Sequence, residues 1–200
     1  MNQEKGLESE NILMRLRRET EKAHRETENQ IAFEKPGFSV SDYRDVLIKF
    51  YAFYLNFEQH IKRAIDRQKI DFNYDERLKT RKLLADLQTL GMDETQISAI
   101  PKNVDLPALN SAEKVYGALY VVEGSTLGGQ IISRRLKERF GFDQSNGAEF
   151  FSGYGAQTGK MWNDFRSTIL KYAEISSKHD EIISSATETF EKFGKALGEK

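Results

Sequence analysis

The sequence predicts an all-α fold in a single domain, and three observations support this prediction. Apolar residues recur at three- and four-residue steps along most of the chain, which is the spacing of one helix face. Only three prolines occur, the last of them at position 107, so long helices are permitted. Period-two alternation, which indicates strands, is lacking. We expect one domain over the 200 residues, with residues 1–8 as a flexible tail.

Two helices are expected in the first third of the chain. The first runs from about residue 9 to residue 30, and Pro36-Gly37 then breaks the chain. The second covers about residues 41–70 and presents a wide apolar face. Ser39 or Ser41 is expected to cap its N-terminus, because a side-chain oxygen there can accept a free backbone amide.

The middle of the chain is expected to hold a third helix and a connector. The third helix covers about residues 75–90, and Gly91 fits the position directly after a helix end. A short helical piece follows at residues 93–100. The connector after it contains Pro101 and Pro107.

Three further helices complete the expected set of six or more. They cover about residues 111–140, 160–175 and 179–197. Residues 141–159 contain five glycines and are expected to form the loop between the first two of these helices. Short connections of this kind suit a helical bundle.

Composition excludes several function classes. Lys and Arg number 30 against 31 Asp and Glu, so nucleic acid is not an expected partner. The absence of cysteine excludes disulfides, thiolate nucleophiles and iron–sulfur clusters. The polar N-terminus is unlike a secretory signal, and no apolar run reaches the length of a membrane span. A cytoplasmic protein is therefore expected.

Four glycines interrupt the helix expected at residues 111–140, at positions 117, 124, 128 and 129. Each interior glycine costs a helix about 1 kcal/mol relative to alanine. Such a cluster indicates either a bend with a bare backbone surface for a flat ligand, or close packing against another helix. The pattern alone leaves both open.

His24 is the second feature that could carry chemistry. Arg17, Thr20 and Glu28 share its helix face, and a carboxylate one turn away can orient an imidazole ring. A plain surface His–Glu pair is the alternative. The other histidines, His60 and His179, show no metal-binding spacing with His24. A histidine on one helix and bare backbone on another would together suit a heme.

These two segments resemble a known family. Residues 16–29, LRRETEKAHRETEN, and residues 120–130, YVVEGSTLGGQ, resemble the proximal and distal helices of bacterial, biliverdin-producing heme oxygenases. The order and separation of the two segments also agree. The resemblance implies a heme oxygenase-like helical bundle with a glycine-kinked distal helix.

The resemblance also implies roles for individual residues. His24 would be the iron ligand, with Glu28 as its partner. Gly124, Ser125 and Gly128 would form the catalytic distal surface, where Ser125 stands in place of an Asp found in many relatives. The other residues implied to bind the heme are Arg17, Tyr120, Gly129, Arg166 and Phe190.

Alternatives remain for several of these positions. Arg17 and Arg166 match residues that meet heme propionates, but solvated surface arginines give the same pattern. Phe190 and Phe193 are expected to wall the macrocycle, although ordinary core packing suits them equally. Trp162 stands where some relatives carry a Lys.

The implied reaction is oxidative cleavage of heme to biliverdin, carbon monoxide and ferrous iron with O2. Electrons would come from a ferredoxin, flavodoxin or reductase, because the chain has no GxGxxG nucleotide motif. The product could serve iron acquisition or a bilin-binding photoreceptor. A heme carrier or sensor without turnover, and a non-heme helical protein, are the alternatives. The meso carbon attacked, the donor and the oligomeric state stay open.

Overall fold

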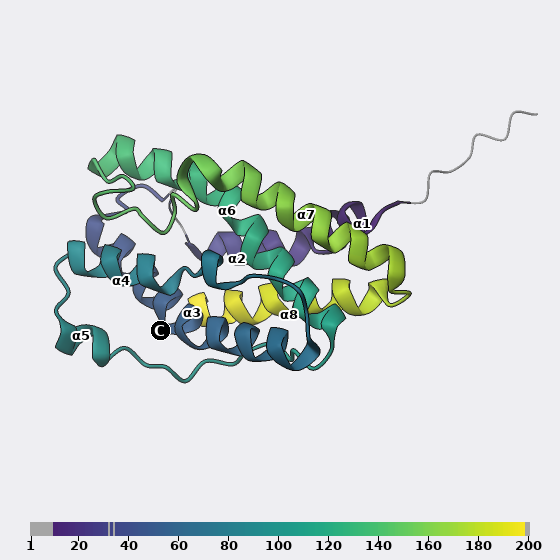
Figure 1. The fold of residues 1–200 in the computed structure, drawn as a ribbon. Coiled ribbons are helices and arrows are strands. Elements are labelled where there is room, and N and C mark those ends of the chain that lie inside the picture. Colours follow the sequence, from purple (N-terminus) through teal and green to yellow (C-terminus); the bar gives the residue numbers. More distant parts are fainter. Residues whose placement is uncertain (1–9, 32, 34, 199–200) are drawn as a thin grey trace, which may run out of the picture.

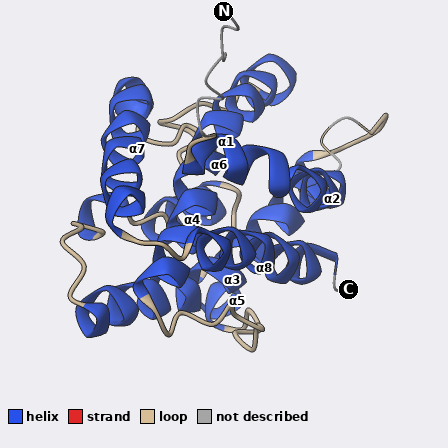
Figure 2. Ribbon diagram, turned by 90° about the vertical axis from the view of Figure 1, so that its right-hand side faces the viewer, coloured by secondary structure: helices blue, strands red, loops and turns tan. Residues whose placement is uncertain are grey.

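The computed structural model describes residues 10–31, 33 and 35–198. These residues form α-helices and two short 3-10 helices, and no strand occurs in this described part of the chain (Figure 2). The all-α prediction is confirmed, and the predicted tail lies outside the described residues. The elements are α1 (Ile12–Glu19), α2 (Glu21–Ile31), α3 (Val40–Gln68), η1 (Asp75–Arg77), α4 (Thr80–Thr89), α5 (Glu94–Ser98), α6 (Ala112–Phe140), η2 (Gly155–Gln157), α7 (Thr158–Ile175) and α8 (His179–Gly198).

Helix α8 lies at the centre of the arrangement and packs against α1, α2, α3 and α6 (Figure 1). Helix α7 packs on α6 and α1, and α4 packs on α3. The core between these helices is rich in aromatic rings. For example, the rings of Phe50 on α3 and Phe193 on α8 meet edge to face with centroids 4.8 Å apart, an arrangement that the charge distribution of aromatic rings favours.

The close contact of α6 with α8 depends on Gly117. A Cβ atom at this position would overlap the backbone carbonyl oxygen of Ile182. Beside it, Ser185 Oγ donates a hydrogen bond to the carbonyl oxygen of Lys114 at 2.8 Å. The two backbones therefore approach at a distance that only glycine allows.

The single helix expected at residues 9–30 is two helices, and the prediction is wrong at Thr20. Both the backbone nitrogen and Oγ1 of Thr20 donate to the carbonyl oxygen of Leu16, at 3.0 and 2.7 Å. A threonine hydroxyl that bonds back to the preceding turn bends a helix. This bond lies at the break between α1 and α2, but it does not cause the break by itself, because Thr27 makes the same bond to Ala23 within the unbroken α2.

The helix expected at residues 75–90 is also interrupted. A 3-10 turn is followed by extended backbone at Leu78, with φ −62° and ψ 134°, before α4 begins. The carboxylate of Glu58 on α3 accepts the backbone amides of Lys79 and Thr80. These are amides that a continuous helix would have bonded internally, so a side chain about 20 residues away decides this break.

The remaining helices agree with the sequence pattern. Ser39 caps α3 and forms a reciprocal capping box with Asp42, and Ser111 caps α6. Gly91 follows α4 with a φ of 86°, a value that favours glycine. Helix α6 changes direction partway along its course (Figure 1). None of the helices among the described residues has the length and apolar character of a membrane span.

The loop between α6 and α7 is held by two residues of α4. Asp86 accepts the backbone amides of Glu149 and Phe150 at 2.8 and 2.9 Å, and Lys82 donates to the carbonyl oxygen of Gly153. Burial raises the pKa of Asp86 from 3.8 to about 6. The loop is thus pinned beside α6.

Replacement of Gly117 by alanine should destabilise the protein strongly. The new methyl group would overlap backbone atoms, which cannot rotate away, so we expect a loss of about 2 kcal/mol or more in the free energy of unfolding. Denaturant unfolding measures this loss. Gly159→Ala is the matched control, because Gly159 is helical and nothing lies within 4 Å of its Cβ position; equal stabilities of the two variants would contradict the close packing.

Asp86 should make stability depend on pH. Because its folded pKa lies above its ordinary value, the proton is bound more tightly in the folded state, and stability falls as the pH rises from 4 through 6. The decrease should reach up to about 3 kcal/mol. Urea unfolding of the native protein and of Asp86→Asn across this range isolates the effect; parallel pH profiles would show that Asp86 does not contribute.

Candidate active site

Helix α2 presents His24 with one side supported and the other open. Its side chain is 49% exposed, and its Nε2 lies 3.3 Å from Oε1 of Glu28. The ring of Phe190 on α8 lies 5.2 Å from the imidazole, centroid to centroid. Thr27 donates to the carbonyl oxygen of Phe190 at 2.9 Å, which fixes α2 against α8. The predicted His–Glu pair and the predicted neighbour Phe190 are therefore found together.

Helix α6 presents an apolar, partly bare face. Positions separated by three or four residues lie on one helix face, and Leu127 and Ile131 on this face are 38% and 55% exposed. A Cβ at Gly128 would meet nothing within 4 Å, and a Cβ at Gly124 would meet only the ring of Trp162 at 3.8 Å. The backbone at these two glycines is open to a ligand.

The four glycines of α6 divide into two pairs. Gly117 and Gly129 serve close packing, since a Cβ at Gly129 would lie 2.9 Å from the carbonyl oxygen of Phe151. The packing interpretation therefore holds for Gly117 and Gly129, and the missing side chain of Gly129 faces the loop. Gly128 faces open space and Gly124 faces the ring of Trp162, so the ligand interpretation stays a prediction for this pair.

Ser125 is exposed on α6 beside the bare face. Its hydroxyl donates to the carbonyl oxygen of Val122 at 2.8 Å, and the buried phenol of Tyr54 on α3 lies nearby. Burial raises the pKa of Tyr54 well above its ordinary value, so this phenol stays protonated. Ser125 is thus a neutral polar group beside a neutral phenol.

Arg17 and Arg166 lie on α1 and α7, which pack against each other. Arg17 is exposed and makes no ion pair with any described residue. Burial raises the pKa of Tyr120, and the nearby charge of Arg17 opposes this effect by lowering it. Arg166 is exposed and has only a long 3.4 Å contact with Asn163. Two cations are therefore available at this end of α6, where Tyr120 meets Trp162 at 6.0 Å.

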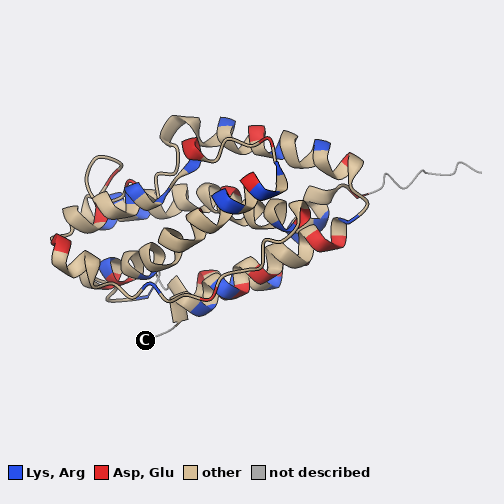
Figure 3. Cartoon of the chain, turned by 60° about the horizontal axis from the view of Figure 1, so that its bottom comes forward, with Lys and Arg blue, Asp and Glu red and all other residues tan. Residues whose placement is uncertain are grey.

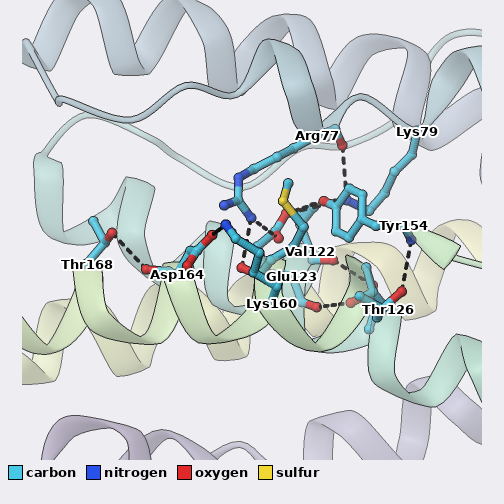
Figure 4. A network of polar contacts seen from close by, with 12 residues as sticks. Arg77, Lys79, Val122, Glu123, Thr126, Tyr154, Lys160, Asp164 and Thr168 are labelled. Atoms are coloured by element: carbon cyan, nitrogen blue, oxygen red, sulfur yellow. Dashed lines mark hydrogen bonds and ion pairs between the residues drawn. The ribbon is translucent and has the colours of Figure 1, made fainter. Parts of the chain in front are cut away.

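Sequence reasoning missed a buried polar cluster behind α6. Glu123, directly before Gly124, is fully buried and contacts Arg77, Lys79 and Tyr154 (Figure 4). The available signal was a carboxylate within the apolar run Tyr120-Val-Val-Glu123, because a buried charge requires partners. Phe193, expected at the ligand, packs instead in the aromatic core with Phe50.

Charged groups elsewhere give no second candidate. Lys and Arg positions are interspersed with Asp and Glu positions along most helices (Figure 3). Within the described residues, no three His, Cys, Asp or Glu side chains gather as a metal site. A metal held by several protein ligands is therefore not indicated there, whereas a single half-exposed histidine suits a metal carried by its own macrocycle.

Comparison with known proteins agrees with this arrangement. The structure is similar to the NO- and CO-bound heme oxygenase of Neisseria meningitidis, with a TM-score of 0.76 and 21% identity over 94% of this chain and 90% of that chain. It is also similar to heme oxygenase from Leptospira interrogans, with a TM-score of 0.70 and 17% identity over 95% of this chain and 100% of that chain. Comparison with curated proteins gave no match. The heme oxygenase family model, however, matches residues 10–199, and the chain therefore belongs to the heme oxygenase family of enzymes.

Proposed function

We propose that the chain cleaves heme oxidatively to biliverdin, carbon monoxide and ferrous iron, with O2 and electrons from an external donor. The observation that supports this most is that two helices packed on α8 each leave one face open. One carries the half-exposed His24, and the other carries the bare backbone at Gly124 and Gly128. Membership of the heme oxygenase family supports the general activity, and these two helix faces carry the residues that we assign to it.

The described residues fit a heme. A flat, mostly apolar macrocycle suits the exposed Leu127 and Ile131 and the open space at Gly128. Its two propionates suit guanidinium groups, which bind carboxylates with paired hydrogen bonds. When bound, heme supplies the redox-active iron and is itself the substrate.

Each residue then has a separate task. His24 would ligate the iron, and Glu28 would hold the imidazole ring in orientation. Arg17 and Arg166 fix the propionate edge, with Tyr120 bordering it. Gly124 and Gly128 would leave room for a small gas ligand, because they carry no side chains. The helix backbone would then lie directly beside that ligand and limit the directions in which it can tilt.

Ser125 gives the distal surface a neutral hydroxyl where many relatives carry an Asp. Gly129 lies beside this surface, and Phe190 supports His24 from α8. Electrons come from a ferredoxin, flavodoxin or reductase, and the biliverdin product is available to a bilin-binding photoreceptor or accompanies iron release. The protein acts in the cytoplasm.

Turnover tests the proposed function directly. One equivalent of hemin added to the purified protein should give a Soret band, and reductant in air with catalase should replace it with the broad red absorption of biliverdin. A Soret band that persists under these conditions would indicate a carrier or sensor. No Soret shift would remove heme from the proposal.

His24→Ala should lose the native ferric spectrum and most of the turnover, because the iron loses its protein ligand. His60→Ala is the matched control, since His60 hydrogen bonds to the carbonyl oxygen of Pro107 and lies outside the proposed site. We expect the control to keep the native ferric spectrum. An unchanged spectrum in His24→Ala would contradict the ligand assignment.

Gly128→Ala should separate stability from heme binding. In heme-free protein, the methyl group enters open space and should raise the free energy of unfolding by about 0.5–1 kcal/mol, because alanine favours helix over glycine. Heme affinity should decrease about tenfold, because the same methyl group enters the ligand's space. Thermal unfolding and hemin titration measure the two effects. Gly159→Ala is the control, and unchanged heme affinity in Gly128→Ala would exclude this surface as the binding site.

A further inference from the structure

Glu123 carries a charge in a fully buried position on α6. Its side chain is 0% exposed, and it forms ion pairs with Arg77 and, at 3.5 Å, with Lys79. The hydroxyl of Tyr154 donates to Glu123 Oε1 at 2.8 Å (Figure 4). These partners come from the segment before α4 and from the loop before α7, so one carboxylate joins three separate parts of the chain.

The charges of this cluster balance. Glu58 and Glu123 provide two anions, while Arg77 and Lys79 provide two cations, and all four side chains are buried. Burial lowers the pKa of Lys79, and the carboxylates of Glu123 and Glu58 oppose that effect. Removing one member leaves an uncompensated buried charge, which is far more costly than the intact set.

The cations of the cluster are also fixed by backbone and ring contacts. Arg77 lies over the ring of Phe72 at 4.7 Å and approaches the carbonyl oxygen of Met161 at 3.3 Å. Lys79 donates to Tyr154 Oη at 3.0 Å and to the carbonyl oxygen of Arg77 at 3.2 Å. Glu123 is therefore bound to groups that have few other conformations available.

The cluster acts at the weakest part of α6. Gly124 and Gly128 supply no side chains for packing, and interior glycines favour bending and local opening. Successive helix residues point about 100° apart, so Glu123 projects to a different side of the helix from Gly124 and holds the helix from its buried flank. It fixes the backbone there without reaching a ligand.

We propose that Glu123 is a positioning residue, which through Arg77, Lys79 and Tyr154 fixes the backbone at Gly124–Gly128 and thereby sets its distance from the heme. The inference rests on the proposed function only for the identity of the ligand. The anchoring itself concerns the heme-free protein, where it is measured separately.

Hydrogen exchange of the heme-free protein tests the anchoring. In Glu123→Gln, amide exchange in the segment 124–128 should accelerate about tenfold, because a buried charge-assisted interaction is lost. Glu113→Gln is the matched control. Glu113 is a second buried carboxylate of α6 and accepts hydroxyl hydrogen bonds from Tyr172 and Ser176, about ten residues from the glycine segment. Equal acceleration of segment 124–128 in both variants would overturn the proposal.

A second variant keeps the test decisive if Glu123→Gln does not fold. Arg77→Lys keeps the positive charge but loses the planar guanidinium, and segment 124–128 should exchange several-fold faster, less than in Glu123→Gln. In Glu123→Asp, which keeps the charge on a shorter side chain, part of the protection should return. Loss of protection in Glu123→Asp equal to that in Glu123→Gln, or native protection in Arg77→Lys, would contradict the proposal.

Spectroscopy of the CO complex tests the distance to heme. The C–O stretching band should shift or broaden in Glu123→Gln and stay native in Glu113→Gln, because only the first alters the backbone facing the gas ligand. Faster exchange with an unchanged band would reduce Glu123 to a purely structural role and overturn the proposal. If the native protein binds heme without turnover, both measurements still apply, so failure of the proposed function is recognised separately.

Discussion

The packing of α8 against α1, α2, α3 and α6 decides which helix faces remain free. On α6, the contact at Gly117 fixes one face against α8, and on α2 the hydrogen bond from Thr27 to Phe190 does the same. Because a helix buried on one side must present its other side elsewhere, the faces with His24 and with Gly124 become available. The position of the candidate site therefore follows from the packing of both α2 and α6 against α8.

Helix α6 is intrinsically weak, and its stability comes from its surroundings. Its glycines would disfavour an isolated helix, so tertiary contacts must compensate. Gly117 and Gly129 contribute such contacts by close backbone packing, and Glu123 contributes a balanced set of buried charges. The two remaining glycines are thereby free to leave backbone bare for a ligand.

Local sequence pattern predicted most of the fold, because helix periodicity and caps such as Ser39 and Ser111 act within a few residues. The His24–Glu28 pair was predictable for the same reason. The break before Thr80 was not, because it depends on Glu58 from α3, and no local pattern indicated the break at Thr20. The partners of Glu123 lie over 30 positions away, beyond the reach of any local pattern.

The bare face of α6 imposes an energetic cost on the heme-free protein. Leu127 and Ile131 keep apolar surface in water, which forgoes about 25 cal/mol for each Å² left exposed, and the glycines forgo helix propensity as well. A ligand that covers this face binds only the folded state and therefore stabilises it by mass action. The features that make α6 a poor helix alone thus couple folding to ligand binding, and the buried contacts of Glu123 on an adjacent side of the helix hold the backbone of the open face in place.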